Sequence, residues 1–129
     1  MIHVTGSIYL ILFNNYASPA VTFKTVKIEN DGTIDDSLLC SYNITKGGYS
    51  NFCSPNIVRV KNDIFAVTYH STNYASASDF VSTIQVSLTG NITLIDTFST
   101  NAYFSSVYGY DEYSDILPSY GSDDLYAVV

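Results

Sequence analysis

The chain has 129 residues, of which 47% are hydrophobic, 15% aromatic and 13% charged, and its formal net charge is −7. It contains 12 tyrosines and 7 phenylalanines, which suit half-buried pleated sheets. This composition is too apolar for a disordered chain. The negative charge repels a phosphate backbone, so nucleic acid is excluded as an expected partner. We therefore expect a folded, all-β protein.

The charge is divided unevenly along the chain. Residues 1–61 carry five basic and four acidic side chains, a formal charge of +1, whereas residues 62–129 carry eight acidic side chains and no basic one. Because runs of like charge usually face water, we interpret the acidic half as a solvated surface.

The first 53 residues predict four strands. They cover Ile2–Val4, Ser7–Phe13, Val21–Ile28 and Ile34–Tyr42. The sequence Asn30-Asp31-Gly32 indicates a hairpin, because Asp-Gly supplies the positive φ angles of tight turns. Ile8–Phe13 is apolar at every position, so we expect this strand to be covered on both faces.

The rest of the chain predicts six further strands and no helix. They cover Asn56–Val60, Ile64–His70, Phe80–Leu88, Ile92–Phe98, Asp115–Leu117 and Leu125–Val129. The connections 43–55 and 99–114 are rich in Gly, Ser, Asn and Tyr and lack helical periodicity, so we expect loops there.

One strand sequence occurs three times. Asn62–Tyr69 recurs as Asp123–Val129 and, near the start, as Gly6–Phe13. A period of about sixty residues is typical of repeated all-β units.

Two further landmarks repeat with the same spacing. The separation from Thr25 to Thr83 equals that from Gly32 to Gly90. The sequence therefore predicts a single β-repeat region over residues 1–129, with a first unit at 1–53, a second at 54–113 and the start of a third at 114–129.

The second unit resembles one blade of a repeat β-propeller, of the kind found in poorly characterised archaeal and bacterial surface proteins. The resemblance rests on Ile57–Val60, Asn62–Tyr69, Phe80–Val86 and Gly90–Ile92. It implies antiparallel four-stranded blades, about two of them and the start of a third. Since four to eight blades close a propeller, it also implies a fragment of a larger protein. The alternative fold is a β-sandwich.

No catalytic site is expected. The only histidines are His3 and His70, and no Gly-x-Ser-x-Gly sequence occurs. Asp63 and Asp124 occupy equivalent positions and are better explained as turn formers than as a carboxylate pair. The sequence offers no convergent acid, base and nucleophile, and no cofactor is expected.

Two clusters near the C-terminus are weak candidates for binding sites. Carboxylates on loops suit calcium, but the spacing matches no EF-hand, and a solvated acidic loop is the preferred interpretation. Tyrosines can bind sugars or protein partners, but packing between units is preferred. The acidic cluster is Asp111, Glu112, Asp115, Asp123 and Asp124, and the tyrosines are Tyr108, Tyr110 and Tyr113.

The two cysteines, Cys40 and Cys53, lack C-x-x-C spacing and neighbouring histidines, so zinc is not supported. A disulfide fits an exported chain, and two thiols fit equally well. No apolar stretch approaches the length of a membrane span, and no targeting segment is visible.

Taken together, these features predict a non-catalytic structural or binding module, most compatible with a secreted or cell-surface protein. Its expected partners are the remaining blades of the parent protein or other copies of itself, with a protein or glycan as ligand. The alternative is part of a propeller hydrolase whose active residues lie largely outside this chain.

Overall fold

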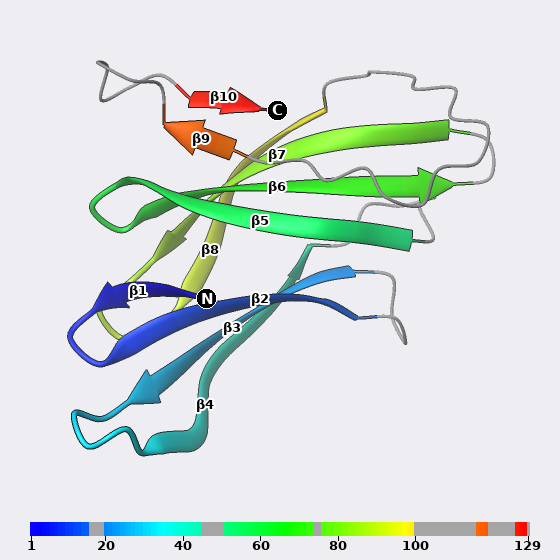
Figure 1. Cartoon of the computed structure of the whole chain (residues 1–129). Helices are drawn as coiled ribbons and strands as arrows, with labels where there is room; N and C mark the ends of the chain where they lie inside the picture. Colours follow the sequence, from blue (N-terminus) through cyan, green and yellow to red (C-terminus); the bar gives the residue numbers. More distant parts are fainter. Residues whose placement is uncertain (16–19, 45–50, 74–75, 100–115, 119–125, 129) are drawn as a thin grey trace.

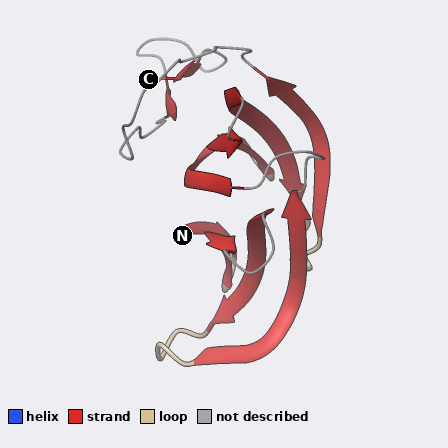
Figure 2. Ribbon diagram, turned by 90° about the vertical axis from the view of Figure 1, so that its right-hand side faces the viewer, coloured by secondary structure: helices blue, strands red, loops and turns tan. Residues whose placement is uncertain are grey.

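The computed structural model describes residues 1–15, 20–44, 51–73, 76–99, 116–118 and 126–128. These residues form antiparallel strands and no helix, which confirms the all-β prediction (Figures 1 and 2). Accordingly, none of them forms a helix long and apolar enough to cross a membrane.

The strands form two four-stranded sheets and one short pair. In each large sheet, consecutive strands are neighbours, and the two sheets are stacked (Figure 1). The first sheet contains β1 (Ile2–Thr5), β2 (Ile8–Asn15), β3 (Ala20–Ile28) and β4 (Ile34–Ile44). The second contains β5 (Asn51–Lys61), β6 (Ile64–Asn73), β7 (Ser76–Val86) and β8 (Ile92–Ser99). The short pair is β9 (Ile116–Pro118) with β10 (Tyr126–Val128).

Every expected strand is present, but one expected loop is partly strand. The connection expected over 43–55 contains the end of β4 and the first residues of β5. Pro55 lies in β5, where the pairing with β6 is irregular between Cys53 and Asn56. Proline is tolerated at such a position on an edge strand because its missing N–H leaves no ladder bond unmade. The loop prediction was therefore wrong for residues 43–44 and 51–55.

The two sheets pair their central strands in the same register. In the first sheet, Tyr9 of β2 lies opposite Val26 of β3. At the corresponding place in the second sheet, Phe65 of β6 lies opposite Ile84 of β7. If the β2 residue numbers are shifted by one constant and the β3 residue numbers by another, every β2–β3 residue pair coincides with a β6–β7 residue pair.

One local irregularity and the turns correspond as well. The β1–β2 register shifts after His3, and the β5–β6 register shifts after Arg59. The turns that follow have positive φ angles at Gly6 (52°) and Asn62 (48°). The turns before β4 and β8 likewise both place a glycine at φ 86°. Positive φ is a backbone conformation that L side chains avoid, so these shared turns are specified by residue type.

The β2 strand is covered on one face only. Leu10 is fully buried, but Tyr9 and Ile11 are half-buried and Phe13 is 36% exposed. The expectation that both faces of this strand are covered was therefore wrong. The corresponding strand of the second sheet, β6, is covered on both faces, because every residue of Phe65–Tyr69 is buried.

We predict that Asn62→Ala lowers the free energy of unfolding by about 1 kcal/mol relative to Asn62→Gly, because only glycine adopts positive φ without a steric cost. Chemical denaturation of both variants measures this difference. Equal stabilities would show that the turn relaxes to negative φ.

Candidate interaction surface

A single hydrophobic core joins the two sheets. Side chains alternate between the faces of a strand, and the register places Phe65, Val67 and Tyr69 on the face of β6 that shares a core with Leu10 and Phe23 of the first sheet. We call the first-sheet side of this contact the inner face. The buried members of this core are Val4, Leu10, Val21, Phe23, Ile44, Phe65, Val67, Tyr69, Phe80, Ile84, Val86 and Ile92.

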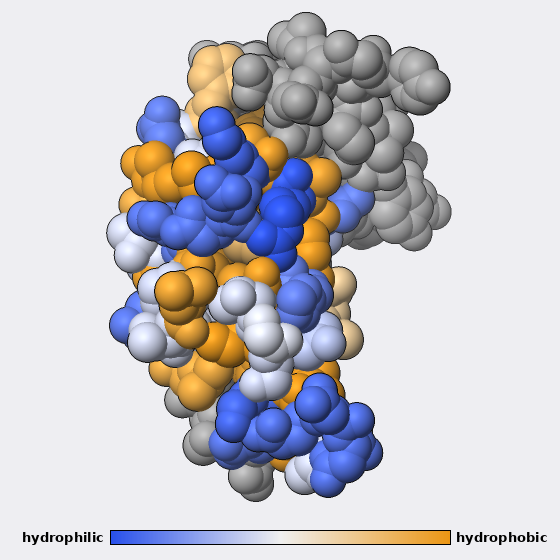
Figure 3. Space-filling view, turned by 90° about the vertical axis from the view of Figure 1, so that its left-hand side faces the viewer, coloured by the Kyte–Doolittle hydropathy of each residue, from blue (hydrophilic) through white to orange (hydrophobic). Residues whose placement is uncertain are grey.

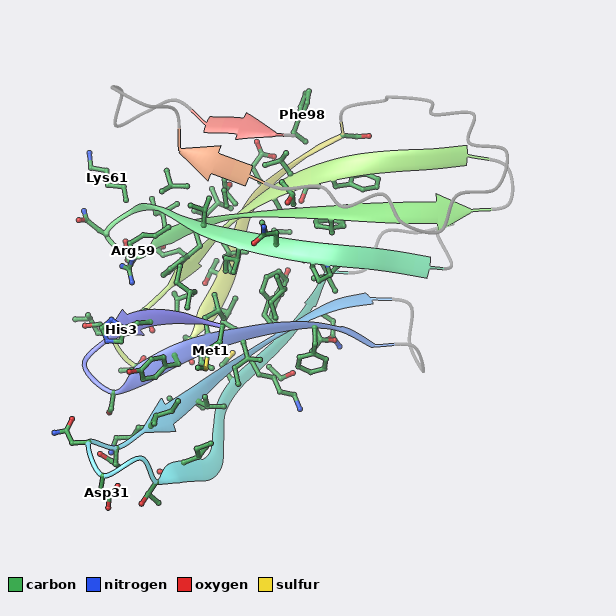
Figure 4. The ribbon with its side chains drawn as sticks, viewed as in Figure 1. Met1, His3, Asp31, Arg59, Lys61 and Phe98 are labelled. Carbon is green, nitrogen blue, oxygen red and sulfur yellow. The ribbon has the colours of Figure 1, made fainter. Side chains whose placement is uncertain are left out.

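Arg59 ties the edge of the second sheet to β1 of the first. Its guanidinium donates to the carbonyl oxygen of Val4 at 2.8 Å and to those of His3 and Asn62, and Figure 4 shows its side chain pointing from β5 toward β1. The guanidinium also lies 4.8 Å from the centre of the Phe65 ring. Arginine suits this place because its planar fork reaches several acceptors while stacking on an aromatic ring.

A second tie lies at the turn between β7 and β8. The Thr25 hydroxyl, fully buried, donates to the carbonyl oxygen of Gly90 at 2.7 Å. A Cβ at Gly90 would lie 3.0 Å from Leu39 Cδ1 and 3.2 Å from Thr25 Oγ1. The absence of a side chain at Gly90 therefore allows the turn of one sheet to approach the other.

We predict that Gly90→Ala destabilises the protein by about 2–4 kcal/mol, because it adds overlap at the sheet interface to the strain of positive φ. Gly32→Ala is the matched control, with the same φ of 86° and nothing within 4 Å of its Cβ. Its cost should be only about 1–2 kcal/mol. Equilibrium denaturation compares them, and equal losses would mean that the interface absorbs the methyl group.

A chain of hydroxyl groups is buried within the second sheet. The Tyr69 hydroxyl is 3.0 Å from Ser82 Oγ, which is 2.9 Å from Thr97 Oγ1. The Tyr69 ring stacks on Phe80 with 5.3 Å between centroids. Burial raises the pKa of Tyr69 above its ordinary 10.0, and the hydrogen bonds with Ser82 and Thr97 oppose this only in part. The three hydroxyl groups hydrogen-bond to one another, and these contacts include no basic side chain that could accept a proton.

The raised pKa of Tyr69 predicts a loss of stability at alkaline pH. The folded chain ionises this hydroxyl less readily than the unfolded chain, so the stabilisation is complete below the ordinary pKa of 10.0. It declines as pH rises through the folded-state pKa. The free energy of unfolding should therefore fall less steeply above pH 10 in Tyr69→Phe than in the wild type. Parallel slopes in urea titrations would contradict this.

One shallow pocket of about 330 Å³ lies between the turns of the two sheets. Lys27 is its charged residue, and its ammonium group is 2.5 Å from the Glu29 carboxylate. This ion pair, above all the hydrogen bond within it, raises the pKa of Lys27. The described lining contains no acid and base pair for catalysis. It is formed by Thr5, Gly6, Ser7, Ile8, Lys27, Leu39, Leu88 and Thr89.

The predicted acidic and tyrosine clusters lie outside the described residues. Their members are Asp111, Glu112, Asp115, Asp123, Asp124, Tyr108, Tyr110 and Tyr113. Within the described part of the chain, no group of three His, Cys, Asp or Glu residues is placed to hold a metal ion. Both clusters therefore stay predictions.

The other candidates named from the sequence lie apart from one another. Asp63 accepts a hydrogen bond from Gln85 at 2.7 Å beside the β5–β6 turn, and His3 lies exposed on β1. His70 is in β6, but its side chain is not described. Cys40 is a free, half-buried cysteine. The side chain of Cys53 is not described, and because Cys40 is free, the possible disulfide between these two cysteines is not formed in this structure.

Sequence reasoning did not identify the residues that join the sheets. Arg59 was not singled out, although it stands between Val58 and Val60 and a charged residue among apolar neighbours in a strand needs partners. Thr25 and Gly90 appeared only as landmarks of the repeat. Their recurrence at fixed spacing was a usable signal, since a conserved spacing between two landmarks indicates a shared structural role.

Two apolar side chains of β8 are exposed. In the second sheet Ile95 is 53% and Phe98 65% exposed, and Figure 4 shows Phe98 pointing away from the body of the molecule. Apolar atoms are also visible between hydrophilic ones on the side that carries the β1–β2 and β5–β6 turns (Figure 3). Contiguous apolar patches mark interaction sites, whereas apolar side chains exposed singly are normal on a protein surface.

Comparison with known proteins identifies no relative: no protein-family model, curated protein or solved structure matches the chain.

Proposed function

We propose that this chain is a non-catalytic structural or binding module, part of a larger β-propeller whose four-stranded blades are β1–β4 and β5–β8. Its task is to hold a rigid stack of sheets from which loops contact a protein or glycan. In the same proposal, β9 and β10 are the first strands of a third blade, and the protein acts at a cell surface or outside the cell.

The correspondence between the two sheets carries the proposal. They share strand order, the full β2–β3 and β6–β7 register and turns with positive φ at corresponding positions. In a β-sandwich the two sheets need not share register and turn positions, because each sheet packs against different neighbours. Units that stack in a series do need it, since each presents the same two faces to its neighbours.

The described residues contain no convergent acid, base and nucleophile, and the proposed binding role does not rest on this absence. The part of a propeller hydrolase remains the second candidate, since active residues of such an enzyme would come from several blades around the channel. No particular observation in the described residues favours it.

Reading the coding DNA on both sides of residues 1–129 tests the proposal. We expect further units of about sixty residues, each with an apolar strand, a glycine turn and a second apolar strand, to a total of four to eight. Stop and start signals immediately outside the region would contradict it.

The encoded longer protein then separates the two candidate functions. For a binding module, a glycan array and pull-down should reveal saturable binding without turnover of chromogenic glycosides or esters. Turnover that is lost when a pair of carboxylates is changed to amides would establish the hydrolase instead.

A further inference from the structure

Two segments of the chain match the acceptor sequence for N-linked glycans, which is Asn-x-Ser or Asn-x-Thr with any residue except proline at x. They are Asn43-Ile44-Thr45 and Asn91-Ile92-Thr93. Such a short pattern also arises by chance, so the sequence does not choose between them. The places of the two asparagines in the fold do.

Asn91 lies in the turn between β7 and β8, at an end of the strands. The Ser87 N–H donates to the Asn91 carbonyl oxygen and the Gly90 N–H to the Ser87 carbonyl oxygen, each at 2.9 Å. The Asn91 N–H donates to Ser87 Oγ at 3.0 Å. These bonds fix the backbone of the turn, while Asn91 itself is exposed.

The carboxamide nitrogen of Asn91 is open to modification. It donates to Thr89 Oγ1 at 3.3 Å, which is longer than the roughly 2.9–3.0 Å usual for an N–H···O hydrogen bond. Thr93, whose hydroxyl completes the acceptor sequence, is exposed as well. Ile92 between them is 7% exposed and belongs to the core. The turn therefore stays anchored while its acceptor group faces solvent.

A third unit packed on the second would leave Asn91 exposed. Thr33 corresponds to Asn91, because each follows a glycine at φ 86° in the turn before the last strand of its sheet. Thr33 is exposed although the second sheet packs on the inner face of the first. The same arrangement one sheet later keeps the β7–β8 turn in solvent.

Asn43, although exposed, lies on a sheet face. It is opposite Thr22 of β3, which is opposite Phe13 of β2, and residues directly opposite each other share a face. At the corresponding positions of the second sheet, Tyr69 and Phe80 are buried. In a larger repeat this face meets a neighbouring unit, so a bulky glycan at Asn43 would obstruct the stack.

We propose that Asn91 is an N-glycosylation site of the exported protein and that its glycan stands beside the β7–β8 turn without disturbing the stack of sheets. The donor is an oligosaccharide joined to a lipid through pyrophosphate. Asn91 Nδ2 forms a bond to the anomeric carbon of the sugar and gives up one proton to a base of the transferase. The bond from that carbon to the pyrophosphate oxygen breaks, and its electron pair leaves with the lipid pyrophosphate. The proposal rests on the proposed function, which places the protein outside the cell.

Cell-free translation of the full chain with microsomes tests the proposal. A signal peptide directs the chain into the microsome, and a tail with one Asn-Gly-Thr acceptor reports that it has entered. The wild type should carry the tail glycan and a second glycan, counted as mobility shifts that an endoglycosidase removes. Asn91→Gln and Thr93→Ala should each lose the second glycan, whereas Thr93→Ser should keep it because serine also completes the acceptor sequence.

Asn43→Gln is the matched control and should leave the number of glycans unchanged. A wild-type chain with the tail glycan alone would overturn the proposal, as would a second glycan that Asn43→Gln removes and Asn91→Gln keeps.

The stability of the glycosylated chain tests whether the fold accommodates the sugar. Its midpoint of denaturation should equal that of Asn91→Gln, and a clearly lower midpoint would overturn the claim that the glycan leaves the stack undisturbed. Neither result bears on the number of units in the longer protein, which the flanking coding sequence decides, so failure of this proposal and failure of the proposed function are distinguishable.

Discussion

The packing of the β6 face on the inner face of the first sheet is the contact on which the architecture depends. Phe65, Val67 and Tyr69 are fully buried and share one core with Leu10 and Phe23. A four-stranded sheet that small has little core of its own, because it can bury apolar side chains only against another layer. Burial of large apolar side chains gives about 1.5–3 kcal/mol each, so the two sheets stabilise each other as a stack.

Two polar contacts fix how the sheets sit in that stack. Apolar contact is non-directional, whereas the Thr25 hydroxyl must reach the Gly90 carbonyl and the Arg59 guanidinium must reach the Val4 carbonyl. Each contact joins a side chain to the backbone of the neighbouring sheet. They therefore set the alignment of the stack and leave the loops at its ends free to differ.

Some described polar side chains are bonded inside the second sheet. Two contacts illustrate this. The Tyr69 hydroxyl is satisfied by Ser82 inside the sheet, and the Asp63 carboxylate is bonded to Gln85 beside a turn. What remains for interaction is the surface at the ends, where Phe13 and Phe98 are exposed.

The sequence by itself determined the strands, their class and the turns, because apolar alternation and positive-φ residues act over a few positions. Only the tertiary structure decided which face of each strand is covered: Ile8–Phe13 and Ile64–Tyr69 are both apolar throughout, yet only the latter has neighbours on both sides. It also decided the roles of Arg59 and Gly90, since their partners are carbonyls and side chains of the other sheet. Contacts between residues distant in sequence leave no local pattern, and backbone acceptors are the same at every residue.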